Sequence, residues 1–403
     1  MKYVCNHVTV GGLKENTTYY YSIVRNGVRT PLREYRTGSF SYLKILFVSD
    51  PQIGASSWER QHGRTLRDAP GAANTAARND GYSWMRTLEK ASAQNTALNF
   101  MISAGDQVDK FNAPREEEYA AYLAPATLRG LAQAPAIGNH DASVPDFSYH
   151  FFVPDMTKFG RTGAGGDYYF SYGPGLFIVL NTNNTSAAEH EMTVAEAVRQ
   201  APAASWRLVV MHQDLYGSGF FHSDSDSLIL RTQLTPMFDR YRIDAVLQGH
   251  DHCYSRSRLL RGDGAPHSSY EYRQPPKNSP YGWNQAYNKN TGTFIPLSHK
   301  KLDAAGAAAN RAFARDNRCY LISDSGAAAS GVLYVTANSA TGSKFYKLAA
   351  QQQDYIAQRS QNRLPGYSVI ELTSAALSID TYELAPDGSP EKIDETFSIR
   401  RSK

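Results

Sequence analysis

The chain has 403 residues, of which 41% are hydrophobic and 20% are charged, a composition typical of a globular protein. This length exceeds one average domain, so we expect one large domain and a smaller piece. The formal net charge of +4 comes from dispersed basic residues and argues against a nucleic-acid partner, and no apolar stretch approaches the length of a membrane span.

Residues 1–39 predict a small all-β piece. We expect short strands at 8–10, 19–24 and 33–37, and Asn26-Gly27 is a strong signal for a two-residue hairpin turn. Three strands cannot bury a core alone, so the piece either packs on the main domain or ends a β-sandwich whose beginning is absent. The run LKENTTYYY resembles the closing strands of a fibronectin type III-like domain, which favours the second alternative and a truncated start.

From residue 40 onward, apolar runs alternate with helical stretches. Strands are expected at 43–48, 98–103, 134–137, 168–172, 176–180, 206–211, 243–247, 333–335, 367–370 and 377–382. Helices are expected at 82–93, 116–131, 187–200 and 225–240. The alternation predicts one α/β domain over residues 40–403, with functional side chains at the carboxyl ends of strands. From about 260 to 318 the chain is polar with weak periodicity, which predicts a long surface excursion.

Five apolar runs end in residues that can bind metals. They are followed by Asp50-Pro51-Gln52, Gly105-Asp106, Gly138-Asn139-His140-Asp141, His212, and Gly249-His250-Asp251-His252. Carboxylates, an amide and imidazoles form a mixed oxygen and nitrogen set suited to Zn, Mn or Fe. In an extended segment His250 and His252 point to one side and could reach adjacent ions, and a carboxylate such as Asp106 can bridge two metals. Five such clusters at strand ends predict a two-metal centre, the recurring device for attack on phosphorus.

The order D-x-Q, GDxxD, GNHD, MH and GHDH resembles the calcineurin-like metallophosphoesterases. GNHD, VVMHQDLYGSGFFH and GHDHCYSRS are similar to the purple acid phosphatase branch, whose catalytic domain commonly follows a fibronectin III-like domain. The resemblance covers residues 40 to about 260 by motif and implies an α/β/β/α sandwich of two mixed sheets. It also implies two divalent or trivalent ions (Fe, Zn or Mn), one held by Asp50, Asp106 and His252, the other by Asp106, Asn139, His212 and His250.

The same resemblance assigns catalytic roles near the metals. His140 would stabilise charge and protonate the leaving group. His222 falls where purple acid phosphatases keep a histidine that binds phosphate or donates a proton, the alternative being a loop histidine without a role. Asp141 is expected to orient His140 or a neighbouring ligand, as a carboxylate does behind a metal site.

Two positions depart from the family pattern. Asp109 stands where the purple enzymes have a tyrosine that binds iron and gives the colour, and Gln52 stands where other metallophosphoesterases have a histidine. The first metal would therefore be completed by the Gln52 amide oxygen, by Asp109 or by water. Motif spacing favours Gln52, with Asp109 as an acceptor that orients a ligand, and we expect a protein that is not purple.

The sequence thus predicts an enzyme that hydrolyses small-molecule phosphate esters by metal-activated hydroxide attack, most closely an acid phosphatase-like phosphomonoesterase. A phosphodiesterase or nucleotide hydrolase of the same fold is one alternative, and a surface-binding protein with a degenerate site is another. The N-terminus lacks the apolar core of a signal peptide, so the expectation of an extracytoplasmic or cell-surface location comes from the family alone.

Overall fold

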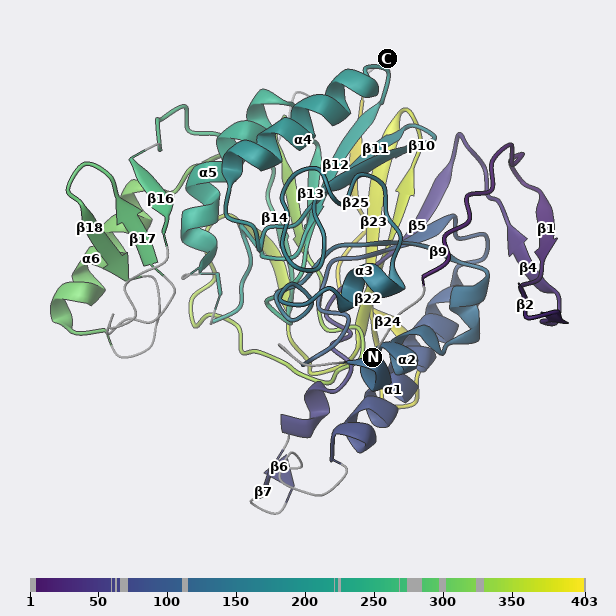
Figure 1. Cartoon of the computed structure of the whole chain (residues 1–403). Coiled ribbons are helices and arrows are strands. Elements are labelled where there is room, and N and C mark those ends of the chain that lie inside the picture. Colours follow the sequence, from purple (N-terminus) through teal and green to yellow (C-terminus); the bar gives the residue numbers. More distant parts are fainter. Residues whose placement is uncertain are drawn as a thin grey trace.

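Two large β-sheets lie face to face at the centre of the molecule (Figure 1). The computed structural model describes residues 5–58, 60–61, 64–65, 72–110, 115–220, 222–223, 226–267, 269–273, 285–296, 302–323 and 330–401. The first sheet contains β5 (Leu43–Val48), β8 (Phe100–Ser103), β9 (Ala132–Pro135), β22 (Gly366–Leu372), β23 (Ala376–Leu384), β24 (Pro390–Lys392) and β25 (Phe397–Arg400). Its order is β24-β23-β22-β5-β8-β9, with β25 paired to β23, and β5, β8 and β9 run parallel.

The second sheet is also mixed. It contains β10 (Tyr168–Tyr172), β11 (Gly175–Leu180), β12 (Trp206–Met211), β13 (Ala245–Gln248), β14 (Tyr254–Ser257), β20 (Leu333–Thr336) and β21 (Ile356–Ser360). The order is β10-β11-β12-β13-β20-β14-β21, in which β11, β12, β13 and β20 run parallel. The expected hairpin of β10 and β11 is confirmed by their antiparallel pairing.

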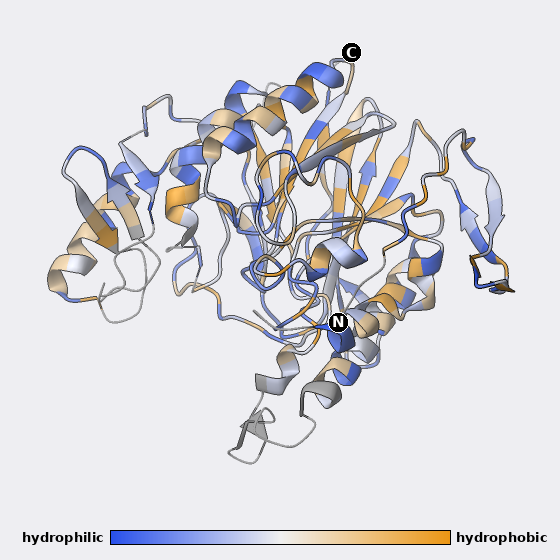
Figure 2. Ribbon diagram, in the orientation of Figure 1, coloured by the Kyte–Doolittle hydropathy of each residue, from blue (hydrophilic) through white to orange (hydrophobic). Residues whose placement is uncertain are grey.

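The period-two alternation of the strands divides their apolar side chains between two layers. In β5, Ile45 and Phe47 face the core between the sheets, whereas Leu46 and Val48 face the outer helices. Leu208 of β12 faces the same central core from the second sheet. Figure 2 shows this concentration of hydrophobic residues on the central strands.

Helices cover the outer face of each sheet, which confirms the predicted α/β/β/α sandwich (Figure 1). The helices are α1 (Ala72–Gln94), α2 (Glu116–Leu123), α3 (Asp146–His150), α4 (Ala187–Gln200), α5 (Asp226–Arg240) and α6 (Ala304–Asp316), with short 3₁₀ turns η1 (Ala55–Trp58) and η3 (Ala126–Arg129). The expectation of one helix over 116–131 was wrong, because Pro125 has no N–H to continue α2. Within the described chain, no helix is both long and apolar enough to cross a bilayer.

The polar stretch after residue 260 is more ordered than its weak periodicity indicated. It contains β15 (Leu260–Arg261), β16 (Tyr270–Tyr272), β17 (Gln285–Asn288) and β18 (Thr293–Pro296), followed by α6 and then β19 (Leu321–Ile322). A small core of Leu228, Ile229, Ala286 and Phe313 joins β17 and α6 to α5. The expected excursion is therefore a small three-stranded sheet with a helix at its side, although residues 274–284 and 297–301 lie outside the described part.

The N-terminal piece forms short strand pairs. β1 (Thr18–Tyr21) pairs with β4 (Arg33–Arg36), and β2 (Val24–Arg25) pairs with β3 (Val28–Arg29) across the predicted Asn26-Gly27 turn. A further short pair, β6 (Arg60–Gln61) and β7 (Arg64–Thr65), belongs to the main domain. The strand expected at 8–10 was wrong, since these residues have no strand pairing and Val8 is 83% exposed. That this piece derives from a fibronectin III-like domain stays a prediction.

Candidate metal centre

The candidate ligands meet at one end of the two sheets. Asp50, Asp106 and Asn139 follow the parallel strands β5, β8 and β9, and His212 and His250 follow β12 and β13. Because the carboxyl ends of parallel strands lie at one edge of a sheet, the packing of two such sheets brings both sets together. Backbone hydrogen bonds connect the loops that carry these ligands. Asp50 N donates to the carbonyl oxygen of Gly105 at 3.1 Å, and Gly249 N donates to the carbonyl oxygen of His212 at 2.9 Å.

Two triads of buried side chains share Asp106. One consists of Asp106, His212 and His250, the other of Asp50, Asp106 and His252, and within each triad the potential ligand atoms lie within 4.8 Å of one another. His212 Nε2 lies 3.4 Å from Asp106 Oδ2, and His252 Nε2 lies 3.3 Å from Asp50 Oδ1. These triads coincide with the carboxylate and histidine members of the two sets that the resemblance implied, including a shared Asp106.

The outer nitrogen of each ring is fixed by the backbone. His212 Nδ1 donates to the carbonyl oxygen of Ala104 at 2.8 Å, and His252 Nδ1 donates to that of Lys344 at 2.8 Å. A proton on Nδ1 leaves the lone pair of Nε2 facing the carboxylates, as in a metal-binding histidine. Asn139 Oδ1 lies 2.9 Å from the same Nε2 of His212, so it joins the first triad.

Backbone strain is concentrated in these residues. Asp50, Gln52, Asp106, His250 and His252 all have positive φ, from 37° to 70°, a region that non-glycine residues rarely adopt. Each such residue costs on the order of 1–3 kcal/mol, and strain of this kind is found where function requires a particular orientation.

Two motif glycines allow the close approach of these strained loops. A Cβ atom at Gly138 would lie 2.1 Å from Asp106 Oδ1, and one at Gly249 would lie 1.9 Å from the Ser49 hydroxyl. Both positions therefore need glycine for lack of space.

The electrostatics of the site favour a cation. Burial lowers the pKa of His212, but the adjoining Asp106 carboxylate outweighs burial and raises that pKa to about 10. Burial raises the pKa of the Asp50 carboxyl group, but the neighbouring His252 outweighs burial and lowers that pKa. A centre that draws a proton onto the buried imidazole of His212 offers the same field to a metal ion.

Gln52 provides a further test of fit. Its amide nitrogen donates to Asp109 Oδ1 at 3.1 Å and lies 2.8 Å from His140 Nε2. Its buried Oε1 has no hydrogen-bond partner among the described atoms. An unpaired buried amide oxygen beside carboxylates and imidazoles suits a metal ligand, so the residues present fit a metal centre with oxygen and nitrogen donors.

The structure gives Asp141 contacts with the backbone. Its Oδ2 accepts from Gly138 N at 3.0 Å and from Gln107 N at 3.3 Å, and Tyr119 donates to Oδ1 at 3.2 Å. Burial and the nearby Asp106 carboxylate raise the pKa of Asp141 to about 7. Asp141 thus holds the turn that presents Asn139, while the ring of His140 is held by the Asp109 carbonyl oxygen, to which Nδ1 donates.

His222 reaches the centre although it lies ten residues after His212. Its ring centroid is 3.7 Å from that of His250 and 5.3 Å from that of Tyr346, and the side chain is half-buried. The surrounding turn is held by Asp251, whose Oδ2 accepts from Ser218 N at 2.9 Å and from the Ser223 hydroxyl at 2.7 Å.

Sequence reasoning missed three residues beside the centre. Arg115, which is fully buried, donates to the carbonyl oxygens of His140 and Asp141. Lys344 and Tyr346 lie in the loop after β20 and border His252. β20 is a parallel strand like β12 and β13, so the rule that found the other ligands, polar residues after a buried strand, could have found this loop too.

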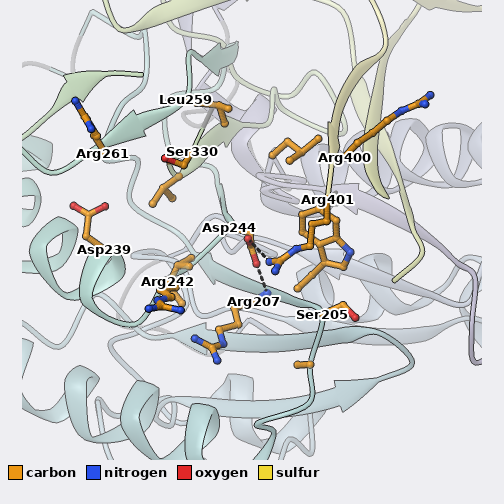
Figure 3. Close-up of a pocket in the computed structure, with 16 residues that line it drawn as sticks. Ser205, Arg207, Asp239, Arg242, Asp244, Leu259, Arg261, Ser330, Arg400 and Arg401 are labelled. Carbon is orange, nitrogen blue, oxygen red and sulfur yellow. Dashed lines mark hydrogen bonds and ion pairs between the residues drawn. The ribbon is translucent and has the colours of Figure 1, made fainter. Parts of the chain in front are cut away.

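A cavity of about 510 Å³ lies elsewhere, at the opposite ends of β12, β13 and β20 (Figure 3). Its lining includes Arg207 and Arg242, and Arg401, which pairs with Asp244 at 2.6 Å. None of the candidate ligands lines it.

Comparison with known proteins agrees with this architecture. An uncharacterised Mycobacterium tuberculosis protein, Rv2577, is 24% identical over 292 residues, which are 64% of this chain and 51% of that protein. The chain spans about half the length of the curated relatives it matches. Among solved structures, purple acid phosphatase PPD1 from yellow lupin seeds has a TM-score of 0.59 at 12% identity, covering 96% of this chain and 60% of that one.

PhoD is similar at a TM-score of 0.56 and 11% identity, covering 96% of this chain and 76% of that one. At such identities the two likenesses establish the fold. The family model described as calcineurin-like phosphoesterase matches residues 43–254, a segment that contains every candidate ligand. The chain therefore belongs to the calcineurin-like phosphoesterase family.

Proposed function

We propose that this chain is a phosphomonoesterase whose centre holds two metal ions of the Fe, Zn or Mn class. The observation that carries the proposal is the pair of buried triads that share Asp106. Asp50, Asp106 and His252 would hold one ion, with the Gln52 amide oxygen completing its ligands. Asp106, Asn139, His212 and His250 would hold the other. When bound, two such ions lower the pKa of a water molecule and neutralise charge on the phosphoryl oxygens.

The protein's own contribution is rigid placement. His212 and His252 are each fixed by a backbone carbonyl, and Asp106 accepts from His140 N at 2.9 Å through its Oδ1. Asp50 Oδ2 accepts from His250 N at 2.9 Å. These backbone hydrogen bonds fix the orientation of both carboxylate groups. Asp106 Oδ2 therefore stays directed toward His212, and Asp50 Oδ1 stays directed toward His252.

His222 is the better placed of the two candidate proton donors. His140 Nδ1 donates to the Asp109 carbonyl, and its Nε2 faces the amide nitrogen of Gln52, so neither ring nitrogen is positioned to give a proton to a substrate. Burial also lowers the pKa of His140. His222 is half-buried, and its ring lies tilted over that of His250 at a centroid distance of 3.7 Å, so its proton would pass to the ester oxygen as the P–O bond breaks.

Metal analysis and turnover test the proposal together. The purified protein would be loaded separately with Zn, Mn and Fe, its metal content determined, and its activity measured on p-nitrophenyl phosphate and on the bis ester. We expect two equivalents of metal and faster hydrolysis of the monoester. Asp106→Asn should lose both ions and turnover, whereas Glu391→Gln, which removes an exposed carboxylate on β24, should change neither.

Two other outcomes would overturn the proposal in favour of a named alternative. Two equivalents of metal with faster hydrolysis of the bis ester would identify a phosphodiesterase. Less than one equivalent of tightly bound metal, with no turnover of either ester, would identify a binding protein with a degenerate site. Full activity of Asp106→Asn would reject this centre altogether.

A further inference from the structure

The loop after β20 connects the two sides of the metal centre. The Ser339 hydroxyl donates to the carbonyl oxygen of Asp50 at 3.0 Å, and the Thr341 hydroxyl donates to that of Pro51 at 2.7 Å. Further along, the carbonyl oxygen of Lys344 accepts from His252 Nδ1 at 2.8 Å. The loop is therefore fixed to the segment of the first candidate ligand and to the ring of another.

This attachment places the ammonium group of Lys344 beside the centre. Its Nζ lies 5.2 Å from the centroid of the Tyr346 ring, a cation–π distance, and that ring lies 5.0 Å from His252 and 5.3 Å from His222. The charge of Lys344 is close enough to act on Asp106 and on His140. Tyr346 thus stands between the lysine and both histidines.

Among the residues that the structure describes, no carboxylate pairs directly with the charge of Lys344. Within the described part of the chain, no ion pair within 4.0 Å involves Lys344, and its side chain is half-buried. Burial lowers the pKa of Lys344, but the Tyr346 hydroxyl and the Asp106 and Asp109 carboxylates outweigh burial and raise that pKa, so the ammonium keeps its charge beside the centre. The Asp106 and Asp109 carboxylates act on it from a distance, and metal ions bound at Asp106 would offset the attraction of that carboxylate.

We propose that Lys344, positioned by Tyr346, binds a non-bridging oxygen of the substrate and makes the site selective for phosphomonoesters over phosphodiesters. The inference rests on the proposed function and names the substrate class of that same site. A monoester phosphate is largely dianionic above its second pKa near 6, whereas a diester carries one negative charge. A fixed cation therefore interacts about twice as strongly with the monoester, and a water-excluded setting increases the difference.

Substitution of Lys344 with a matched control tests this selectivity. Lys344→Gln removes the charge and keeps much of the length, Lys344→Arg keeps the charge, and Lys347→Gln removes an exposed charge three residues further on. Each metal-loaded protein would be assayed on p-nitrophenyl phosphate and on its bis ester. Binding of inorganic phosphate would be measured by calorimetry, and metal content and Tm would be recorded.

We expect Lys344→Gln to reduce kcat/KM for the monoester by about 10- to 100-fold, the loss of one charge-assisted hydrogen bond, and to change the diester rate less than about threefold. Phosphate affinity should fall by a similar factor, with metal content unchanged. Lys344→Arg should recover most of the loss, and Lys347→Gln should match the wild type.

The possible results distinguish a failure of the Lys344 inference from a failure of the proposed phosphomonoesterase function. If the wild type hydrolyses neither ester, the proposed function fails. If the wild type hydrolyses the monoester but Lys344→Gln weakens both esters equally, or leaves phosphate binding unchanged, Lys344 has no role in selectivity. Tyr346→Leu, which removes the ring and leaves the lysine, should reproduce part of the Lys344→Gln phenotype, and a normal ester ratio would show that Tyr346 does not position it.

Discussion

The amide nitrogen of Gln52 lies 2.8 Å from Nε2 of His140, and the geometry around this pair determines which atom carries each proton. The same nitrogen lies 3.1 Å from Asp109 Oδ1, and a carboxylate can only accept, so the amide cannot be turned over. The carbonyl oxygen of Asp109 accepts from His140 Nδ1. His140 Nε2 is therefore an acceptor, the imidazole is neutral, and the oxygen of Gln52 is left for another partner.

This arrangement makes a prediction for Gln52→Leu. The substitution removes the proposed amide ligand of one ion and leaves Asp106, Asn139, His212 and His250 for the other. Loss of a residue that only orients a ligand already lowers metal affinity by roughly 10- to 100-fold, so loss of the ligand itself should cost at least as much. Competition with a chelator should therefore show one weakened site and one unchanged site, with Gln358→Leu on β21 as a control. Two sites of wild-type affinity in Gln52→Leu would exclude Gln52 as a ligand.

The environment of Asp109 leads to a spectroscopic prediction. Where the purple enzymes place tyrosine, Asp109 uses its carboxylate to accept from Gln52. With no tyrosinate at that position, the iron-loaded protein should lack an intense visible charge-transfer band. The absorption spectrum of the Fe(III) form provides the test. An intense band that disappears in Tyr346→Phe would instead place the phenolate of Tyr346 on the metal.

Arg115 supports the loop that carries Asn139 and His140. Its guanidinium is fully buried, donates to the carbonyl oxygens of His140 and Asp141, and lies 3.6 Å from Asp146 Oδ2. Arg115→Met would leave the Asp146 charge and two carbonyl groups poorly paired, which costs on the order of 3–5 kcal/mol. Urea unfolding should show this loss, whereas Arg129→Met at an exposed position should stay within about 0.5 kcal/mol of wild type. Equal stability of the two variants would contradict the structural role.

The sequence was informative where local signals and tertiary packing agree. Helix α4 and strand β12 have the predicted bounds, because a clean amphipathic run and a six-residue apolar run each define their own ends. β14 and β21 went unpredicted, since their polar residues alternate without a long apolar run and their pairing partners are far away in the chain. Such strands form because another strand of the sheet is available to pair with them, and a short stretch of sequence does not show whether that partner exists.

The residues of the candidate site also fall into two groups, those that the sequence motifs predicted and those that only the fold brings to the site. Motif residues such as His250 are found by spacing, whereas Lys344 and Arg115 act through contacts with distant segments. Arg115 contacts His140, 25 positions away, and the Lys344 carbonyl meets His252, 92 positions away. Neither residue lies in a motif whose chemistry is apparent from the residue types alone. A positively charged residue in a polar loop is most often a solvated one, and only the fold distinguishes these two.

His190 gives the protein a pH-dependent stability that is independent of the metal centre. Its Nδ1 lies 2.8 Å from Asp167 Oδ2 and its Nε2 lies 2.9 Å from the carbonyl oxygen of Asn184, so both nitrogens donate and the ring is an imidazolium. Burial lowers the pKa of His190, but the Asp167 carboxylate outweighs burial and raises that pKa above its ordinary value of 6.5.

A pKa raised by folding means that the folded state binds this proton more tightly than the unfolded state. The stabilisation from His190 is thus fully present below about pH 6.5 and is lost as the pH rises through the pKa of the folded state. The total loss in the free energy of unfolding is about 1.36 kcal/mol for each unit by which the folded pKa exceeds the unfolded pKa. Urea unfolding of the metal-loaded protein at pH 6 and pH 9 should show this loss in the wild type and a flatter dependence in His190→Gln. His7→Gln, at an exposed position, should keep the wild-type slope, and a wild-type slope in His190→Gln would show that this histidine is neutral in the fold.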